Sequence, residues 1–350
     1  MAINKFFSGL PYYHQDSLSV TFGEPISSST IYDQCTHVAN AVEPVVDELL
    51  KQAASAPRFA IDDTHNKILE QKPELRDKPN GKGQATRKGV YTSGLIAFLA
   101  NQYEIVLFDT SLGHAGEHLD SILQTRNNDL PIPLVMSDAL SSNSVTKYTI
   151  QKSYCNAHCR RQFIDLEKSL PETVSWVIEK YNLIWKFDKQ SRDQNMSMAA
   201  RLKHHKEHSL PIMTELYDWA IKQQQDDDYE EHGTLGKAIN YLVRHYDKLT
   251  AFCHIEGAML DNNRMEETLK MIIRLRKTAH FFRTKNGARL SNILNSIIAT
   301  AYRAEVNLFE YLTVLQQNRV KVKANPSLWL PWNYYKQLPT VEEIVPDKAA

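Results

Sequence analysis

Two aspartates follow short apolar runs of the kind that form buried strands. Asp62 comes directly after Phe59-Ala60-Ile61, and Asp138 comes directly after Leu134-Val135-Met136-Ser137. Side chains at strand ends are held by a rigid scaffold and still reach solvent, so catalytic groups collect there. Two carboxylates brought together repel each other unless a cation neutralises them, and oxygen ligands select hard ions such as Mg²⁺ or Mn²⁺. Each aspartate alone could equally cap a turn.

A third carboxylate, Glu266, lies on a predicted helix. Asp261 or Asn262 can cap this helix, and its apolar stripe consists of Met265, Leu269, Ile272 and Ile273. The adjacent face carries Glu266, Lys270, Arg274 and Lys277. Three cations to one acid do not form a balanced salt-bridge ladder. They suit a face that binds metal at one point and a polyanion beside it, and the alternative is an ordinary solvated face.

The charge of the chain is balanced overall and uneven locally. The 350 residues contain 41 Lys and Arg against 41 Asp and Glu, which excludes a uniformly basic DNA-binding protein and a strongly acidic binding module. Residues 264–323, however, carry 12 basic against 4 acidic side chains, a local excess of 8. Such a patch can neutralise phosphates, while the acidic stretch at 223–232 is predicted to be a solvated loop.

Other classes are excluded by composition and spacing. No apolar run approaches the roughly 18 residues that a membrane-spanning helix needs, and the first 16 residues do not resemble an export signal. The four cysteines are too few and too scattered for a disulfide framework, so we expect reduced thiols in a cytoplasmic protein without a membrane partner. The glycine-rich stretch 80–89 matches neither the dinucleotide fingerprint nor the P-loop.

The pattern along the chain predicts a mixed α/β fold. Residues 1–55 are predicted to be helical, either as a helix-turn-helix or as a plain helical hairpin packed on the next domain. Strands are predicted at 58–62, 90–101, 104–108, 134–137 and 147–152, with an amphipathic helix at 114–124. Residues 156–258 form a predicted helical insertion with breaks at Pro171 and Pro211. Residues 259–320 carry the Glu266 helix and further helices, and 321–350 form a predicted extended tail packed against the body.

Seven motifs, in order, resemble the transposases of the insertion sequence 66 family. They are Gly9-Leu-Pro-Tyr-Tyr-His-Gln15, Asp62-Asp-Thr64, Ser137-Asp-Ala139, Cys155-Asn-Ala-His-Cys-Arg-Arg-Gln-Phe163, the Arg201 to Trp219 segment, Leu260-Asp-Asn-Asn-x-x-Glu266 and Leu330-Pro-Trp-Asn333. The resemblance implies an RNase H-like fold, with 56–155 as the first part of the catalytic domain. It also implies that a DDE triad of Asp62, Asp138 and Glu266 is catalytic and binds two Mg²⁺ or Mn²⁺ ions.

The resemblance further implies that the chain cleaves and joins DNA by two-metal phosphoryl transfer. The implied partners are double-stranded DNA, at transposon ends and at the target, and other copies of the chain on that DNA, in the cytoplasm at the nucleoid. The expected DNA-contacting residues are His158, Arg160, Arg161, Asn262, Asn263, Lys270, Arg274 and Lys277. Cys155, His158 and Cys159 are too few for a four-ligand structural zinc site, and a packed Cys and His is the alternative to a DNA contact.

Two departures from the family pattern leave other functions open. Glu267 stands where the family has an arginine after the catalytic glutamate, and Asp63 replaces a glutamate. The family's upstream coiled-coil and zinc-binding regions are also not found in the sequence. This implies a truncated element, one part of a split reading frame or an adapted derivative. The alternatives are therefore a decayed transposase that only binds DNA or a partner, and an RNase H-like nuclease unrelated to transposition.

Overall fold

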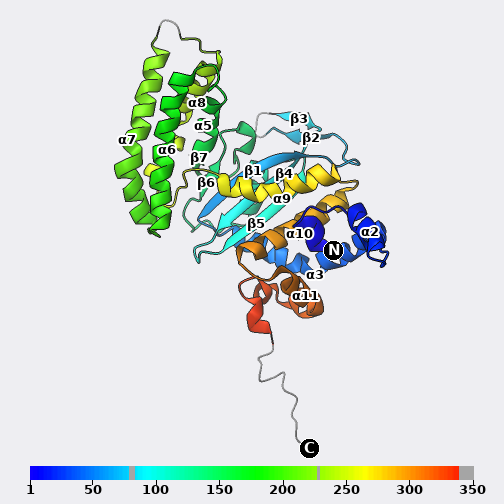
Figure 1. Ribbon diagram of the computed structural model, residues 1–350. Helices are drawn as coiled ribbons and strands as arrows, with labels where there is room; N and C mark the ends of the chain where they lie inside the picture. Colours follow the sequence, from blue (N-terminus) through cyan, green and yellow to red (C-terminus); the bar gives the residue numbers. More distant parts are fainter. Residues whose placement is uncertain (79–82, 227–228, 339–350) are drawn as a thin grey trace, which may run out of the picture.

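The core of the protein is a five-stranded mixed sheet (Figure 1). The computed structural model describes residues 1–78, 83–226 and 229–338. The strands are β1 (Arg58–Asn66), β4 (Val90–Phe98), β5 (Glu104–Ser111), β6 (Leu134–Ser137) and β7 (Gln151–Tyr154), in the order β5-β4-β1-β6-β7. β4 is antiparallel to β1 and β5, whereas β1, β6 and β7 are parallel to one another, so β4 runs against the other four. The predicted mixed α/β class is confirmed.

The strand predictions hold in place and differ in length. β1 continues to Asn66 rather than ending at Asp62, because its second half stays paired with β4 after β6 has ended. The strand predicted at 147–152 lies a few residues later, as β7. A small hairpin of β2 (Glu74–Asp77) and β3 (Gln84–Arg87) was not predicted. Its strands have four residues each and bury no side chain fully, so they lack an apolar signal.

Helices cover both faces of the sheet and one of its edges. On one face, α9 (Asn263–Ala279) packs Met265 and Leu269 against Ala60 and Met136. On the other face lie α3 (Ser28–Ala53) and α4 (Ala115–Leu123). Helix α10 (Lys285–Arg303) runs along β5, the outermost strand.

Side chains of α10 hydrogen-bond the free edge of β5. The backbone N–H of Phe108 donates to Ser296 Oγ at 2.9 Å, and that of Val106 donates to Thr300 Oγ1 at 3.0 Å. A sheet edge with unpaired backbone groups is a template for aggregation. The two hydroxyl side chains of α10 therefore close this edge of the sheet.

The N-terminal helices α1 (Ala2–Phe6) and α2 (Tyr12–Thr21) lead into the long helix α3. Ser27 is the N-cap residue of α3, and its hydroxyl accepts from the N–H of Thr30. The buried side of α3, which includes Leu49, joins the core beneath the sheet and contacts α10, α11 and α12. The predicted helical character of residues 1–55 is confirmed.

A four-helix insertion projects beyond the β7 edge of the sheet (Figure 1). It consists of α5 (Asn156–Ile164), α6 (Pro171–Asp193), α7 (Met198–Gln224) and α8 (Thr234–Leu249), which share a core of their own. The predicted break at Pro211 is wrong, because this residue lies inside α7. Pro211 lacks the N–H that would bond the carbonyl of Glu207, but Glu207 is exposed, so water can solvate that carbonyl.

The C-terminal part folds back on α3. After α11 (Leu308–Gln317) and α12 (Arg319–Ala324), two 3₁₀ turns follow at Pro326–Trp329 and Tyr334–Gln337, where an extended tail was predicted. The apolar rings determine this path: Trp329 is buried in the core, and Trp332 stacks on Tyr103 at 4.6 Å. The rest of the predicted tail, 339–350, lies outside the described residues.

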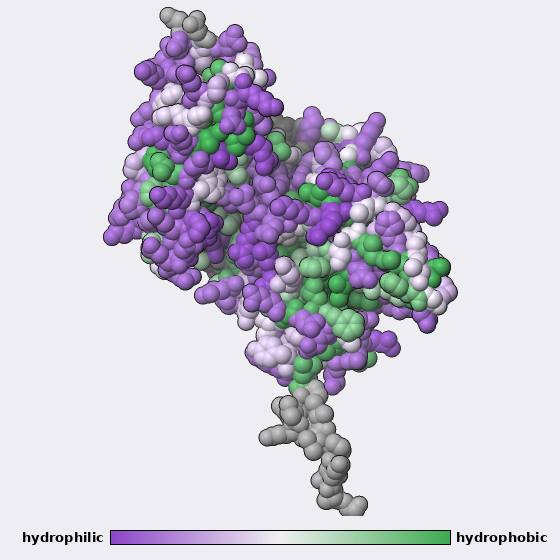
Figure 2. Space-filling view, in the orientation of Figure 1, coloured by the Kyte–Doolittle hydropathy of each residue, from purple (hydrophilic) through white to green (hydrophobic). Residues whose placement is uncertain are grey.

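Within the described residues, every helix is too short or too polar to cross a lipid bilayer. Figure 2 shows hydrophilic side chains over most of the insertion and hydrophobic ones gathered around the N-terminal helices. On α2 and just after it, Leu18, Val20 and Phe22 are exposed by 42%, 59% and 76%.

Candidate active site

Strand register brings Asp62 and Asp138 together. In the parallel pairing of β1 with β6, the last partners are Ala60 and Met136. Asp62 and Asp138 each follow two residues later, so they extend from the same level of adjacent strands. Side chains two residues apart lie on the same face of a strand, so Asp62 shares the face on which Ala60 contacts α9. Asp138 lies one residue beyond β6, and its charge acts on Asp62, so the two carboxylates are close.

The surroundings of Asp62 oppose its negative charge. Burial raises its pKa to about 7, and the charges of Asp138 and Glu266 act in the same direction. Only the N–H of Asp63, which donates to Asp62 Oδ1 at 2.8 Å, favours the ionised form. Two strand carboxylates and one helix carboxylate thus repel one another in a partly buried place, which is the electrostatic setting of a cation site.

Asp138 is held by the loop that follows β6. Burial raises the pKa of Asp138, and two hydrogen bonds to Oδ1 oppose this, from Asn143 Nδ2 at 2.8 Å and from the N–H of Leu140 at 3.3 Å. Asn143 belongs to a 3₁₀ turn, Ser141–Asn143, that packs on α4. The carboxylate is thereby fixed with one oxygen bonded to protein.

The close approach of this loop to α4 depends on Gly116. A Cβ at Gly116 would lie 2.3 Å from the carbonyl oxygen of Ser144 and 2.9 Å from the carbonyl carbon of Asn143. We therefore expect Gly116→Ala to lower the free energy of unfolding by about 1–3 kcal/mol, measured by urea denaturation. Gly287→Ala is the matched control, because its Cβ would meet only the Thr284 hydroxyl at 3.4 Å. Equal stability of the two variants would contradict this account.

Glu266 reaches the site because the segment before α9 is tied to two other elements. The side chain of Asn262 donates to the carbonyl of Ile61 at 3.0 Å, and its backbone N–H lies 3.2 Å from Cys155 Sγ. The carbonyl of Leu260 accepts from the N–H of Asn156 at 3.2 Å. The first turn of α9 is thus fastened between β1 and the start of α5.

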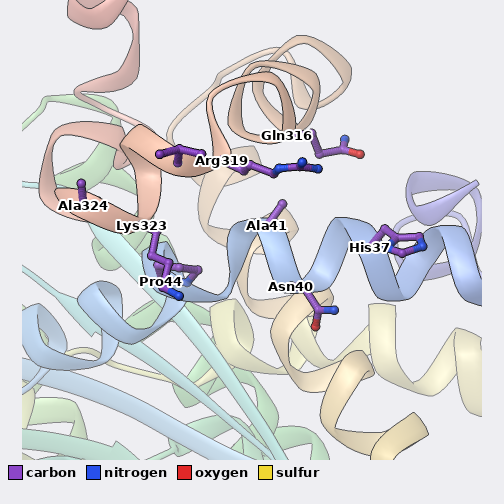
Figure 3. A pocket seen from close by; sticks show the side chains of 9 residues that line it. His37, Asn40, Ala41, Pro44, Gln316, Arg319, Lys323 and Ala324 are labelled. Carbon is purple, nitrogen blue, oxygen red and sulfur yellow. The ribbon is translucent and has the colours of Figure 1, made fainter.

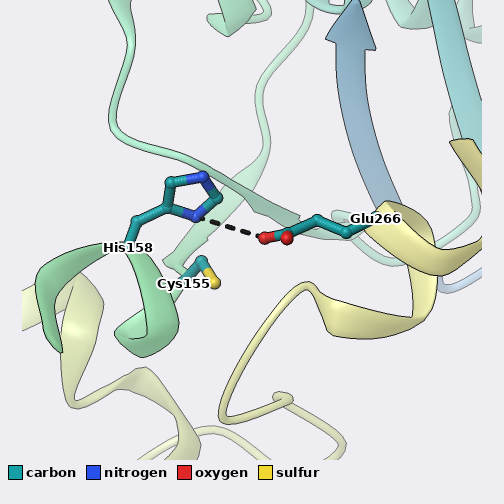
Figure 4. A group of neighbouring side chains, drawn as sticks. All are labelled: Cys155, His158 and Glu266. Atoms are coloured by element: carbon teal, nitrogen blue, oxygen red, sulfur yellow. Dashed lines mark ion pairs between the residues drawn. The ribbon is translucent and has the colours of Figure 1, made fainter. Parts of the chain in front are cut away.

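The carboxylate of Glu266 points toward α5 (Figure 4). Its Oε1 lies 3.6 Å from His158 Nδ1, and its Oε2 lies 3.7 Å from Arg161 Nη2. Ligand atoms of Cys155, His158 and Glu266 all lie within 4.8 Å of one another, whereas Asp62, Asp138 and Glu266 do not form one such group. The charges of Asp138 and Glu266 both act on Asp62, and the carboxylate of Glu266 lies next to His158.

The residues predicted to contact DNA fall into two groups. Asn263, Lys270, Arg274 and Lys277 are exposed on α9, and Arg160 and Arg161 lie on α5 beside the site. Asn262 is only 1% exposed, so the prediction that it contacts DNA is wrong: its amide is used to hold α9 to β1. Arg160 Nη2 donates to Asn182 at 3.2 Å, within the insertion.

Sequence reasoning missed Asn143 and His114. His114 Nδ1 lies 2.7 Å from Asp63 Oδ2, on the opposite face of β1 from Asp62. Neither residue belongs to a motif with a recognisable spacing, so only the fold could reveal them. A cavity of about 610 Å³ lies elsewhere, between α3 and α12, with His37, Arg319 and Lys323 in its wall (Figure 3). None of its lining residues is one of the predicted site residues.

Relief of charge repulsion gives a test of the acidic cluster. At about pH 8 without metal, Asp62→Asn should raise the free energy of unfolding by about 1–2 kcal/mol, because it removes a charge that burial and three neighbouring acids, Asp138, Asp63 and Glu266, disfavour. Adding Mg²⁺ should also raise the midpoint temperature of thermal unfolding of the parent chain and leave that of this variant unchanged.

The neighbouring aspartate is the matched control for that test. Asp63→Asn removes the partner of His114 and should lower stability by about 1 kcal/mol. If Asp62→Asn also lowered stability, the proposed charge repulsion at Asp62 would be contradicted.

The fold and site define an α/β protein with an acidic cluster in the middle of β1 and just after β6, and with a large helical segment between β7 and α9. The model of the family described as "Transposase IS66 family" matches residues 1–290, and the chain belongs to this family. It is 23% identical over 355 residues to the uncharacterized protein y4jD of Sinorhizobium fredii, covering 95% of this chain and 65% of that protein. It is 22% identical over 319 residues to y4hP of the same organism, covering 85% and 54%. The chain thus spans between about half and two thirds of these relatives' length.

Proposed function

We propose that the chain is the catalytic core of a DNA transposase, with Asp62, Asp138 and Glu266 as its DDE triad. The observation that carries the proposal is the register of β1 and β6, which sets two aspartates side by side facing the helix that carries Glu266. Family membership supports the same chemistry. The strand order β5-β4-β1-β6-β7, in which β4 alone among these five strands runs antiparallel to the others, supports an RNase H-like fold.

The residues of the site suit divalent hard cations. The pKa of Asp62 is raised by burial and by its acidic neighbours, and Glu266 Oε1 is a buried oxygen without a hydrogen-bond partner. Asp62, Asp138 and Glu266 would hold two Mg²⁺ or Mn²⁺ ions. Bound ions of this kind polarise a phosphate and activate a water or a 3′-hydroxyl for in-line displacement.

The chain's own residues orient the carboxylates and bind the substrate. Asn143 keeps one oxygen of Asp138 engaged, which leaves the other for the cation. The exposed Lys270, Arg274 and Lys277 continue along α9 from Glu266, and can neutralise DNA phosphates next to the reacting one. Double-stranded DNA, at transposon ends and target, is the proposed substrate, bound by several copies of the chain at the nucleoid in the cytoplasm.

A cleavage and strand-transfer assay tests this proposal. Duplex DNA and supercoiled plasmid incubated with the chain and Mg²⁺ should give nicked and joined products. No products should form when EDTA is present from the start. Cleavage without any joining would favour the nuclease alternative. Salt-sensitive DNA binding with neither reaction would contradict the catalytic proposal.

The second candidate is a protein that binds DNA or a partner without cutting. Glu267 favours it, because this exposed acid adds a negative charge on α9 directly beside Glu266 where the resembling motif has an arginine. Replacing it tests the candidate: Glu267→Arg should strengthen DNA binding at low salt and steepen its salt dependence. If the catalytic proposal is correct, the same change should also raise the cleavage rate.

A further inference from the structure

A thiol, an imidazole and a carboxylate converge beside the acidic cluster. Cys155 is the N-cap residue of α5, His158 lies in the first turn of that helix, and Glu266 lies in the first turn of α9. Figure 4 shows the three side chains directed at a common point between the two helices. One ligand atom from each lies within 4.8 Å of the other two.

Two atoms of this group are buried without any hydrogen bond. They are His158 Nδ1 and Glu266 Oε1, which lie 3.6 Å apart. This exceeds the 2.7–3.2 Å of a normal N–H···O bond, so the pair does not satisfy itself. A buried polar atom without a partner calls for an explanation, and an ion between the two atoms is one that would satisfy both. A separation of 3.6 Å is also close to the roughly 3.3–3.7 Å between two ligands of one tetrahedral ion with bonds of about 2.0–2.3 Å.

The donor set selects a thiophilic ion over magnesium. Sulfur and imidazole nitrogen are poor ligands for Mg²⁺ and good ones for Zn²⁺, which also accepts a carboxylate oxygen. Burial raises the pKa of the Cys155 thiol to about 12, so it keeps its proton until an ion displaces that proton to solvent. The Asn262 N–H, 3.2 Å from the sulfur, can then donate to the thiolate.

The fourth position of a tetrahedral ion would be filled by water. Cys159 does not belong to the group: it lies in the core of the insertion with Tyr181. Arg161, 3.7 Å from the second oxygen of Glu266, is 58% exposed in its side chain and can swing into solvent. The arrangement of three protein ligands with an open position differs from a closed structural zinc site.

We propose that Cys155, His158 and Glu266 form a binding site for one Zn²⁺ ion, and that this ion inhibits the chain by withdrawing Glu266 from the acidic cluster. The site itself stands on the geometry of the three side chains. The inhibitory part rests on the proposed function, because it requires Glu266 to bind the catalytic ions. Glu266 can serve one site or the other, so zinc and magnesium should compete.

Cobalt absorption tests the site without any activity measurement. Co²⁺, which takes the same ligands as Zn²⁺, should give one equivalent of binding with a thiolate-to-cobalt charge-transfer band in the parent chain, and Zn²⁺ should displace it. Cys155→Ser should abolish the band, and His158→Asn and Glu266→Gln should weaken binding by more than the 10- to 100-fold that losing an outer-shell partner costs. Cys159→Ala, four residues from Cys155, is the matched control and should keep the band.

The outcomes separate this inference from the proposed function. A band that persists in Cys155→Ser, or no cobalt bound by a parent chain whose circular dichroism shows it folded, would overturn the site. With the site established, Zn²⁺ at micromolar concentration should inhibit magnesium-dependent cleavage, and less so in Cys155→Ser; equal inhibition of both would overturn the inhibitory part. If the chain binds cobalt as described but never cleaves DNA, the zinc site stands and the catalytic proposal fails.

Discussion

Replacing Asp138 by alanine should lower the rate of magnesium-dependent DNA cleavage by about 10³-fold or more. Asp138 is 6% exposed and one of its oxygens is occupied by Asn143 and Leu140, so the remaining oxygen is the group available to a cation. Loss of a metal ligand removes several kcal/mol of transition-state stabilisation. The measurement is the initial rate of nicking under single-turnover conditions, with DNA binding measured separately.

Asp129→Asn is the control for this prediction. It removes an exposed carboxylate from a loop of the same domain and should leave cleavage unchanged. Asn143→Ala should give an intermediate loss, because Asp138 would keep its charge and lose its orientation. A cleavage rate in Asp138→Ala equal to that of the parent chain would remove this residue from the triad.

The position of each aspartate after a buried run could be predicted because such a run is a local pattern in the sequence, whereas the pairing of β1 with β6 joins distant segments. The run Leu134–Ser137 before Asp138 is buried throughout and corresponds to β6 residue for residue. The run before Asp62 likewise marks the buried half of β1, although the strand continues past it. Parallel pairing then needs only one pair of partners, Ala60 with Met136, to set both carboxylates at one level. Their shared role as metal ligands remains a prediction.

The contacts of Glu266 could not be predicted, because they join segments far apart in the chain. His158 is more than a hundred residues from Glu266, and no periodicity reports that their helices begin side by side. Asn262 was misjudged for the same reason: an asparagine before a helix suggests a cap or a surface contact, and its bond to Ile61 depends on the distant strand. Pairwise tertiary contacts of polar residues leave no pattern in one sequence.

The Arg201 segment shows a motif whose function is structural. The resemblance drew attention to Arg201 and Ser209 within the insertion. Arg201 forms an ion pair with Asp188 of α6, and Ser209 Oγ lies 3.0 Å from His205 Nδ1 on α7. Both contacts lie between or within α6 and α7, so these residues hold the insertion together. The same core fixes α5, and with it the position of His158 and Arg161 against Glu266.

A direct test of that scaffold is Asp188→Asn, which should lower the free energy of unfolding by about 1–3 kcal/mol in urea denaturation. Asp188 is 1% exposed, forms ion pairs with Arg201 and with Arg192 at 2.9 Å, and lies 3.3 Å from His205 Nε2. Removing this buried anion leaves the two guanidinium groups without compensation. Asp193→Asn removes an exposed pair with Lys189 instead and should cost no more than about 0.5 kcal/mol.

The same carboxylate should make the insertion sensitive to acid. Burial acts to raise the pKa of Asp188, but His205, whose Nε2 lies 3.3 Å from Oδ1, and the charges of Arg201 and Arg192 outweigh it, so the folded pKa lies below its usual value. A depressed folded pKa contributes stability that is fully present above the unfolded pKa of about 3.9 and is lost as the pH falls through the folded value. Unfolding of α6 and α7, followed by amide hydrogen exchange, should therefore become easier below about pH 4 in the parent chain. Asp188→Asn should lack this part of the acid dependence, and an unchanged acid profile in the variant would show that other carboxylates control it.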